Sequence, residues 1–180
     1  LARINSEGTE GGISLAGETD NSLGALFQAT TWDAAVGLTN GQTLAVSDLA
    51  IGVGMASLTI GTNLTDGTLQ PLAAGGALTL ANHAPGSALV INTPITNNTS
   101  ASSLVKFGSG PVQVNGVIAH TGATVVNEGA LILAANTLTQ ALAGVISGNG
   151  NLVKEGSGRI DLNVANTYTG ETVVRGGTLM

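Results

Sequence analysis

The amino-acid sequence predicts an all-β protein, a parallel β-solenoid of about seven to eight coils at roughly 20–25 residues per coil. Three observations support this fold class. One segment of the chain occurs twice, short strand-like stretches alternate with Gly and Asn turns, and the chain is only 9% charged and 2% aromatic. Self-similarity at a fixed period is typical of stacked repeats. Small and β-branched side chains suit the thin core that such a stack encloses.

The two copies of the segment align without a gap, so that Leu104 matches Leu152 and Leu131 matches Leu179. Residues 104–131 read LVKFGSGPVQVNGVIAHTGATVVNEGAL, and residues 152–179 read LVKEGSGRIDLNVANTYTGETVVRGGTL. A 48-residue unit would hold about two coils of roughly 20–25 residues. The residues of the first copy that recur unchanged in the second are Leu104, Val105, Lys106, Gly108, Ser109, Gly110, Asn115, Thr121, Gly122, Thr124, Val125, Val126, Gly129 and Leu131.

If two coils make one repeat, equivalent residues should stack along the solenoid axis. We therefore expect Leu104 and Leu152, and likewise Val125 and Val173, to point inward in the same axial column or in columns two coils apart. A β-sandwich is the rival architecture, but its immunoglobulin-like form usually carries an aromatic core. This chain has one Trp, one Tyr and two Phe.

Strands of three to six residues should dominate the chain. Several alternate apolar and polar residues, as in Leu78-Thr79-Leu80, a pattern that indicates one buried face. Gly and Asn between the strands supply the positive φ angles of tight corners. One short helix is expected near Leu23–Gln28, as a lateral decoration, whereas Asn136–Gly144 is interpreted as a strand and a corner.

Charge excludes some classes of partner. The net charge is −6. The few basic residues form no cluster, so we expect neither nucleic-acid binding nor a polybasic membrane contact. No apolar run approaches the ~18 residues of a transmembrane helix, and we expect no membrane insertion of this segment. Cysteine is absent, which fits a secreted protein without disulfides. The basic residues are Arg3, Lys106, Lys154, Arg159 and Arg175.

The ends of the chain predict a segment of something longer. The chain opens LARINSEGTEGG, without an initiator Met or a signal peptide. We expect residues 1–180 to form a single solenoid segment of a longer or processed protein. Neither Leu1 nor Met180 lies in a polar cap of the kind that solenoids need. The predicted partners are therefore further coils of the same chain, or other copies stacked end to end.

No catalytic, cofactor or metal site is predicted. Glycosidase chemistry needs two carboxylates facing one bond, whereas the aspartates here are scattered. His83 and His120 show no zinc-ligand spacing. Ser109 and Ser157 have glycine directly on both sides, unlike a nucleophile elbow, which reads Gly-x-Ser-x-Gly. The scattered aspartates are Asp20, Asp33, Asp48, Asp66 and Asp161.

Five further residues are interpreted individually, and for three of them two interpretations compete. Asn115 and Asn163 are either ligand contacts or, as we prefer, corner residues that stack on a like residue. Lys106 and Lys154 precede equivalent Gly-Ser-Gly corners, and we expect each ammonium to reach water at the edge. Trp32 is either a sugar-stacking platform or a buried anchor.

The second copy also resembles a known repeat. The stretch from Gly148 to Gly158 reads GNGNLVKEGSG, and it is followed by Asn166-Thr167-Tyr168-Thr169-Gly170 and Gly176-Gly177-Thr178-Leu179. This order and spacing resemble the autotransporter-associated β-strand repeat, also called the passenger-associated transport repeat. The first copy departs from the family pattern at Ala119-His120.

The resemblance implies a right-handed parallel β-helix, exported as a passenger to the bacterial cell surface or secreted. The implied function is a non-catalytic stalk for display or adhesion, with host or surface glycans as a further candidate partner. Two alternatives remain open: a self-assembling extracellular fibre subunit that stacks end to end, and a β-helix polysaccharide-active enzyme or sugar-binding module. The resemblance implies no cofactor and no catalytic residue.

Overall fold

The computed structural model describes residues 1–4, 11–14, 19–134, 136 and 139–180. Within these ranges the chain is all β, with strands that run parallel to their neighbours and pair coil on coil. The described residues include no helix long and apolar enough to cross a membrane.

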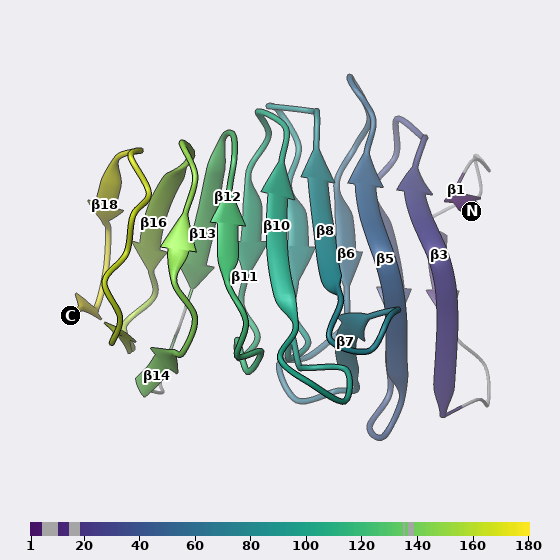
Figure 1. The fold of residues 1–180 in the computed structure, drawn as a ribbon. Coiled ribbons are helices and arrows are strands. Elements are labelled where there is room, and N and C mark those ends of the chain that lie inside the picture. The colour runs from purple at the N-terminus through teal and green to yellow at the C-terminus, as the bar shows by residue number, and fades with distance from the viewer. Residues whose placement is uncertain (5–10, 15–18, 135, 137–138) are drawn as a thin grey trace.

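The strands form three sheets, named here front, back and third (Figure 1). The front sheet comprises β1 (Ala2–Ile4), β3 (Asp20–Gln28), β5 (Thr43–Ile51), β7 (Thr68–Pro71), β8 (Ala77–Asn82), β10 (Ser103–Phe107), β12 (Thr124–Val126) and β15 (Ile146–Ser147). The back sheet comprises β2 (Gly11–Ser14), β4 (Ala34–Gly37), β6 (Leu58–Ile60), β9 (Leu89–Ile91), β11 (Val112–Val114), β13 (Ala130–Ala134), β16 (Asn151–Glu155) and β18 (Thr172–Val174). The third sheet comprises β14 (Thr139–Leu142), β17 (Arg159–Leu162) and β19 (Thr178–Leu179).

The chain winds as a right-handed solenoid. In Figure 1 the front strands run upward, the back strands run downward, and the chain advances from right to left. This winding is the one that right-twisted parallel strands favour. In the described chain the front sheet has seven strands along its path and the back sheet has eight. The predicted β-solenoid and its number of coils are confirmed.

The core consists of columns of inward side chains, each stacked on its partner in the coil before. One column of the front sheet carries Leu26, Leu49 and Leu80, which register with one another and are 3% exposed or less. One column of the back sheet carries Val36, Ile60, Ile91, Val114 and Leu133. The aliphatic side chains fill the interior without aromatic rings, as the composition predicts.

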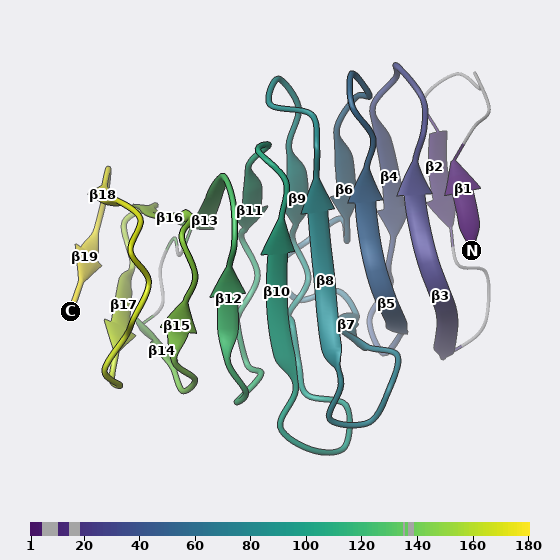
Figure 2. The same cartoon turned by 45° about the horizontal axis from the view of Figure 1, so that its top comes forward.

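The cross-section changes along the axis. Near the N-terminus β3 and β5 are long front strands of nine residues, as Figure 2 shows. In the next coil β7 pairs with the first half of β5 and β8 with its second half. A bend at residues 72–76 separates β7 from β8. Beyond β7 this part of the wall continues from coil to coil as isolated parallel bridges, from Leu69 to Ile95 and from Ile95 to Ile118. Toward the C-terminus the third sheet gives the coil a third side.

The expected helix near Leu23–Gln28 is wrong. These residues belong to β3, which pairs with β1 on one side and β5 on the other. Side chains along β3 alternate between inward and outward, with Leu26 and Gln28 buried. Pairing on both edges satisfies the backbone more fully than one isolated turn of helix would. The tertiary contacts therefore override the local pattern. The expected strand within Asn136–Gly144 is confirmed as β14, although 137–138 lie outside the described residues.

Candidate functional site: the lysine corners of the repeat

Lys106 and Lys154 both point into the core, and their side chains are 0% exposed. Lys106 lies in β10 and continues the front column above Leu80, with Val126 next in line. Lys154 lies in β16, between Leu133 and Val174 of the back column. Each lysine therefore occupies a position that is aliphatic in the neighbouring coils. The expectation that the two ammonium groups reach water is wrong.

Backbone carbonyl groups replace water around each ammonium. The Nζ of Lys106 donates to the carbonyl oxygens of Phe107 at 3.0 Å and of Gly108 at 2.5 Å. The Nζ of Lys154 donates to the carbonyl oxygens of Glu155, of Gly156 at 2.8 Å and of Gly176 at 3.2 Å. Except for Gly176, which lies in the corner of the following coil, the acceptors lie where the chain leaves the lysine's own strand, because a tight corner turns its carbonyl groups away from the sheet. Hydrogen bonds of this charged kind are stronger than neutral ones.

The corner of the following coil closes over each ammonium. Gly129 follows Lys106 at the same sequence spacing at which Gly177 follows Lys154, and the two glycines have φ angles of +63° and +67°. A Cβ on Gly129 would lie 3.0 Å from the Nζ of Lys106, and one on Gly177 would lie 2.9 Å from the Nζ of Lys154. Glycine is therefore required there by both conformation and space. We call each lysine, with its own corner and the glycine of the next coil, a lysine corner.

Burial shifts the ionisation of these groups. Desolvation lowers the pKa of Lys106 from 10.5 to about 8, and the nearby Glu128 carboxylate opposes the shift. Burial also lowers the pKa of Lys154. At neutral pH Lys106 is still charged, because its pKa lies above 7. Its ammonium is stabilised by the carbonyl oxygens of its corner.

A second feature of the repeat is a hydrogen bond to a recurring threonine. The hydroxyl of Tyr168 lies 2.6 Å from Oγ1 of Thr172, and Nε2 of His120 lies 3.5 Å from Oγ1 of Thr124. In the first copy His120 stands where the second copy has Tyr168. Its ring makes the equivalent contact with the threonine, although the residue departs from the family pattern. His120 is 4% exposed, and burial lowers its pKa, although the backbone of Ser102 and of Gly122 acts in the opposite direction.

Other corners of the front sheet hold buried amide side chains. Nδ2 of Asn82 donates to the carbonyl oxygens of Ser87 and Pro111 at 2.9 and 2.8 Å, and Nε2 of Gln28 donates to that of Trp32 at 2.8 Å. Gln28 and Asn82 are both 0% exposed. Sequence reasoning missed these two residues. The available signal was a polar residue at an inward position of an alternating strand, directly before a corner.

Asn115 has the structural role that we preferred. Its Nδ2 donates to Oδ1 of Asn92 in the coil before at 2.8 Å, and Nδ2 of Asn92 donates to the carbonyl oxygen of Gly61 at 3.1 Å. The like residue on which Asn115 stacks is thus Asn92, whereas Asn163 is exposed near the C-terminal end. Trp32 is 64% exposed, so its interpretation as a buried anchor is wrong.

The predicted acidic residues lie apart. Asp161 is paired with Arg159 at 2.5 Å, Asp33 accepts the backbone N–H of Ser57 at 2.9 Å, and Asp66 accepts the side-chain amide of Asn63 at 2.6 Å. Asp20 and Asp48 lie on β3 and β5. In the described part of the chain, no three His, Cys, Asp or Glu side chains converge as metal ligands would. His83, Ser109 and Ser157 are exposed corner residues.

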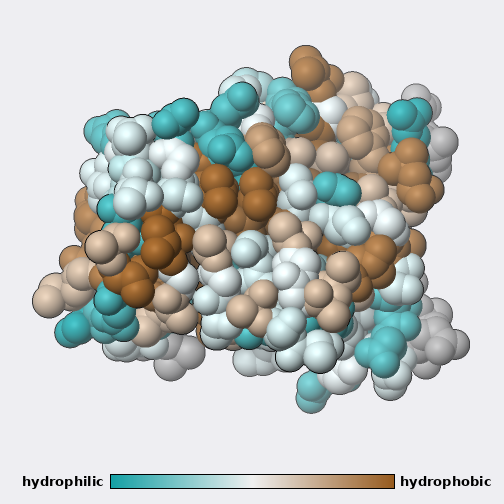
Figure 3. All heavy atoms as spheres, in the orientation of Figure 1, coloured by the Kyte–Doolittle hydropathy of each residue, from teal (hydrophilic) through white to brown (hydrophobic). Residues whose placement is uncertain are grey.

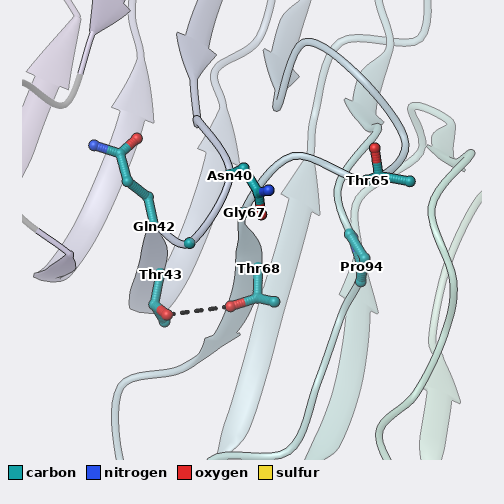
Figure 4. A pocket seen from close by; sticks show the side chains of 8 residues that line it. Asn40, Gln42, Thr43, Thr65, Gly67, Thr68 and Pro94 are labelled. Atoms are coloured by element: carbon teal, nitrogen blue, oxygen red, sulfur yellow. Dashed lines mark hydrogen bonds between the residues drawn. The ribbon is translucent and has the colours of Figure 1, made fainter.

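A groove of about 320 Å³ lies near the start of β5 and β7 (Figure 4). Its lining carries no charged side chain. Thr43 and Thr68 lie in neighbouring coils, with their Oγ1 atoms 3.2 Å apart. Its hydroxyl and amide groups can form hydrogen bonds with a neutral polar ligand. The lining residues are Asn40, Gly41, Gln42, Thr43, Thr65, Gly67, Thr68 and Pro94.

The two copies of the repeat do not lie on the same side of the solenoid. Leu104 is in front strand β10, whereas Leu152 is in back strand β16. Val125 and Val173 are likewise divided between β12 and β18, and Val125 faces outward between the buried Thr124 and Val126. The predicted axial columns are therefore wrong. Leu104 pairs with Thr124 one coil later, and Thr124 pairs with Ile146 after a second coil. The offset between the two copies therefore spans two full coils and the additional step from the front sheet to the back sheet.

Comparison with known families identifies the two segments. Residues 104–133 and 152–180 match the passenger-associated transport repeat, so the chain contains two copies of the repeat that the sequence resembles. No curated protein and no solved structure matches the chain. The two matched segments include both lysine corners.

Replacing Lys106 with Met should destabilise the protein by about 1–3 kcal/mol, because the buried carbonyl oxygens of Phe107 and Gly108 lose their charged donor. The Lys154→Met variant should lose a similar amount. Urea unfolding followed by circular dichroism measures both changes. Arg159→Met is the matched control: it removes an exposed cation, whose ion pair with Asp161 is screened by water, and should leave the urea midpoint nearly unchanged. Lysine variants as stable as the wild type would contradict the role of the corners.

The free energy of unfolding should rise with pH above about 8. The folded chain releases the proton of Lys106 near pH 8, whereas the unfolded chain holds it up to about pH 10.5. Between these values the unfolded state binds more protons, so alkaline pH favours folding. Urea unfolding across this range should show a steeper rise for the wild type than for Lys106→Met. Equal slopes in the two proteins would show that Lys106 keeps an ordinary pKa.

Proposed function

We propose that this chain is a non-catalytic stalk segment of an autotransporter passenger, located outside the bacterial cell, where it carries a display or adhesion function. One observation supports this most strongly. The lysine and threonine positions that recur in both copies make hydrogen bonds within the solenoid, to corner carbonyl groups and to a nearby ring, and the recurring corner glycines let successive coils approach closely. An enzyme or lectin repeat would instead present its recurring polar residues to solvent.

The geometry suits a stalk because its hydrogen bonds run along the axis. Parallel pairing joins each coil to the next, and the lysine corners add donors where the strands end. Figure 3 shows the outer face of the front sheet as small apolar groups among polar and neutral residues. Surfaces without a large apolar patch are typical of proteins that stay separate from one another along their sides.

Polysaccharide-active and sugar-binding functions have weaker support. Asp33, Asp66 and Asp161 make separate structural contacts, and the lining of the groove carries no carboxylate pair of the kind that glycoside hydrolysis requires. Trp32 is exposed and could stack on a sugar ring. Glycans therefore stay as candidate partners of a stalk that also adheres.

Antibodies raised against this segment should label intact cells of the bacterium that produces it. Immunogold electron microscopy is the measurement, with a cytosolic protein as the control for cell integrity. Label that appears only after permeabilisation would contradict an extracellular stalk.

Purified protein should leave a panel of polysaccharides uncleaved. Turnover that Asp161→Asn abolishes, but Asp48→Asn does not, would establish an enzyme instead.

End-to-end stacking is the second candidate, and exposure of the last coil favours it. Val174 continues the back column above Lys154 but is 50% exposed, and Met180 is 65% exposed. Further coils, of the same chain or of another copy, would cover these side chains and pair with the open strand edges.

The isolated segment should therefore associate as its concentration rises, with Val174→Lys weakening association by placing a charge on the covering surface. Sedimentation velocity measures the effect. Val125→Lys, on the outer face of the front sheet, is the control and should associate like the wild type. A stable, folded monomer at high concentration would contradict stacking.

A further inference from the structure

The chain contains three Asn-Gly sequences, and the structure places them in different surroundings. An Asn side chain followed by Gly can react with the next backbone nitrogen, because glycine has no side chain to obstruct the approach. The reaction needs an accessible side-chain amide and a backbone N–H that no hydrogen bond holds. The three pairs are Asn40-Gly41, Asn115-Gly116 and Asn149-Gly150.

Two of the pairs are held by the neighbouring coils. The N–H of Gly116 donates to the carbonyl oxygen of Ile91 at 3.2 Å, and that of Gly150 donates to the carbonyl oxygen of Val126 at 2.7 Å. Their asparagine side chains are also engaged. Nδ2 of Asn115 donates to Asn92, and Oδ1 of Asn149 accepts the hydroxyl of Thr169 at 3.0 Å. Attack on either amide would require the stacked coils to separate.

The Asn40-Gly41 pair is free by comparison. Both residues are exposed, and an added Cβ on Gly41 would meet no atom within 4 Å. The N–H of Gln42 donates to the carbonyl oxygen of Thr39 at 3.0 Å, and Gly41 has a φ of +85°. This is a type II turn with Gly41 at its third position, in which the central N–H is not bonded within the turn. No residue in the described part of the chain pairs with the Asn40 amide or the Gly41 N–H.

We propose that Asn40 is a site of spontaneous deamidation in the folded protein. The nitrogen of Gly41 loses its proton and attacks Cγ of Asn40. The new C–N bond closes a succinimide ring, and the Cγ–Nδ2 bond breaks, so that ammonia leaves with the proton. Water then hydrolyses either carbonyl of the ring and gives aspartate or isoaspartate. Addition of water and loss of ammonia balance the reaction without an oxidant or a reductant.

The product would change the groove described above, since Asn40 lies on its lining (Figure 4). A carboxylate would replace a neutral amide near Thr43 and Thr68. The isoaspartate form would also lengthen the main chain inside the turn. The groove would then favour cations over the neutral polar ligands that suit its present lining.

Peptide mapping by mass spectrometry tests the proposal with two internal controls. The purified chain is incubated at mildly alkaline pH, sampled over time and digested. In the folded protein the Asn40 peptide should gain the mass of the acid at least about tenfold faster than the Asn115 and Asn149 peptides, since these react only after local opening. In concentrated urea the three rates should converge. Asn40→Gln should abolish the fast product without changing the circular dichroism spectrum.

Two outcomes would overturn the proposal. Equal rates at all three pairs in the folded protein would show that stacking gives no protection. An Asn40 peptide that reacts in urea but not in the folded chain would show that the turn holds the side chain away from the Gly41 nitrogen.

Discussion

Parallel pairing of successive coils is the constraint on which the rest of this structure depends. Each inward side chain must fit between its equivalents in the coils above and below, so the core forms aliphatic columns such as Leu26–Leu49–Leu80. The corners cannot be filled in this way, because there the carbonyl groups turn away from the sheets and lack strand partners. Buried side chains with donors satisfy them: Gln28, Asn82 and the two lysines. Burying an ammonium is costly in general, and here the carbonyl oxygens offset only part of that cost, because burial still lowers the pKa of both lysines.

The fold class could be predicted from the repeat, the aliphatic composition and the Gly/Asn corners, because each follows directly from stacking. The helix expected near Leu23–Gln28 is wrong because strand pairing with coils distant in sequence decides the conformation of this segment. The expectation for the lysines fails for a related reason. A lysine at the end of an alternating strand fits an exposed edge or a buried corner equally well. Only the direction of the following carbonyl groups distinguishes the two, and the sequence does not encode that direction locally.

The candidate site is visible in the sequence only as a spacing. Lys106 and Gly129 recur at Lys154 and Gly177, but nothing in the letters shows that each pair meets one coil apart. By contrast, the stacking of Asn115 on a like residue follows from the known behaviour of asparagine at solenoid corners. The expectation of an asparagine partner is correct, but the partner, Asn92, lies outside the repeat, so the repeat alone could not identify it.

The mismatch between sequence period and coil length has a consequence for function. In the repeat region Leu104 pairs with Thr124, and Thr124 pairs with Ile146, so each coil is shorter than half of the repeat. The repeat therefore begins on the front sheet in its first copy and on the back sheet in its second. In a three-sided solenoid with coils of this length, three such copies would fill about seven coils. Identical surface positions then rotate around the axis and return to one side only every third copy. Such an array cannot build a continuous binding strip from its repeated residues, but it places a lysine corner on each side in turn. This arrangement distributes the lysine corners around the axis. In the stalk that we propose, recognition would then depend on residues that the repeat does not specify.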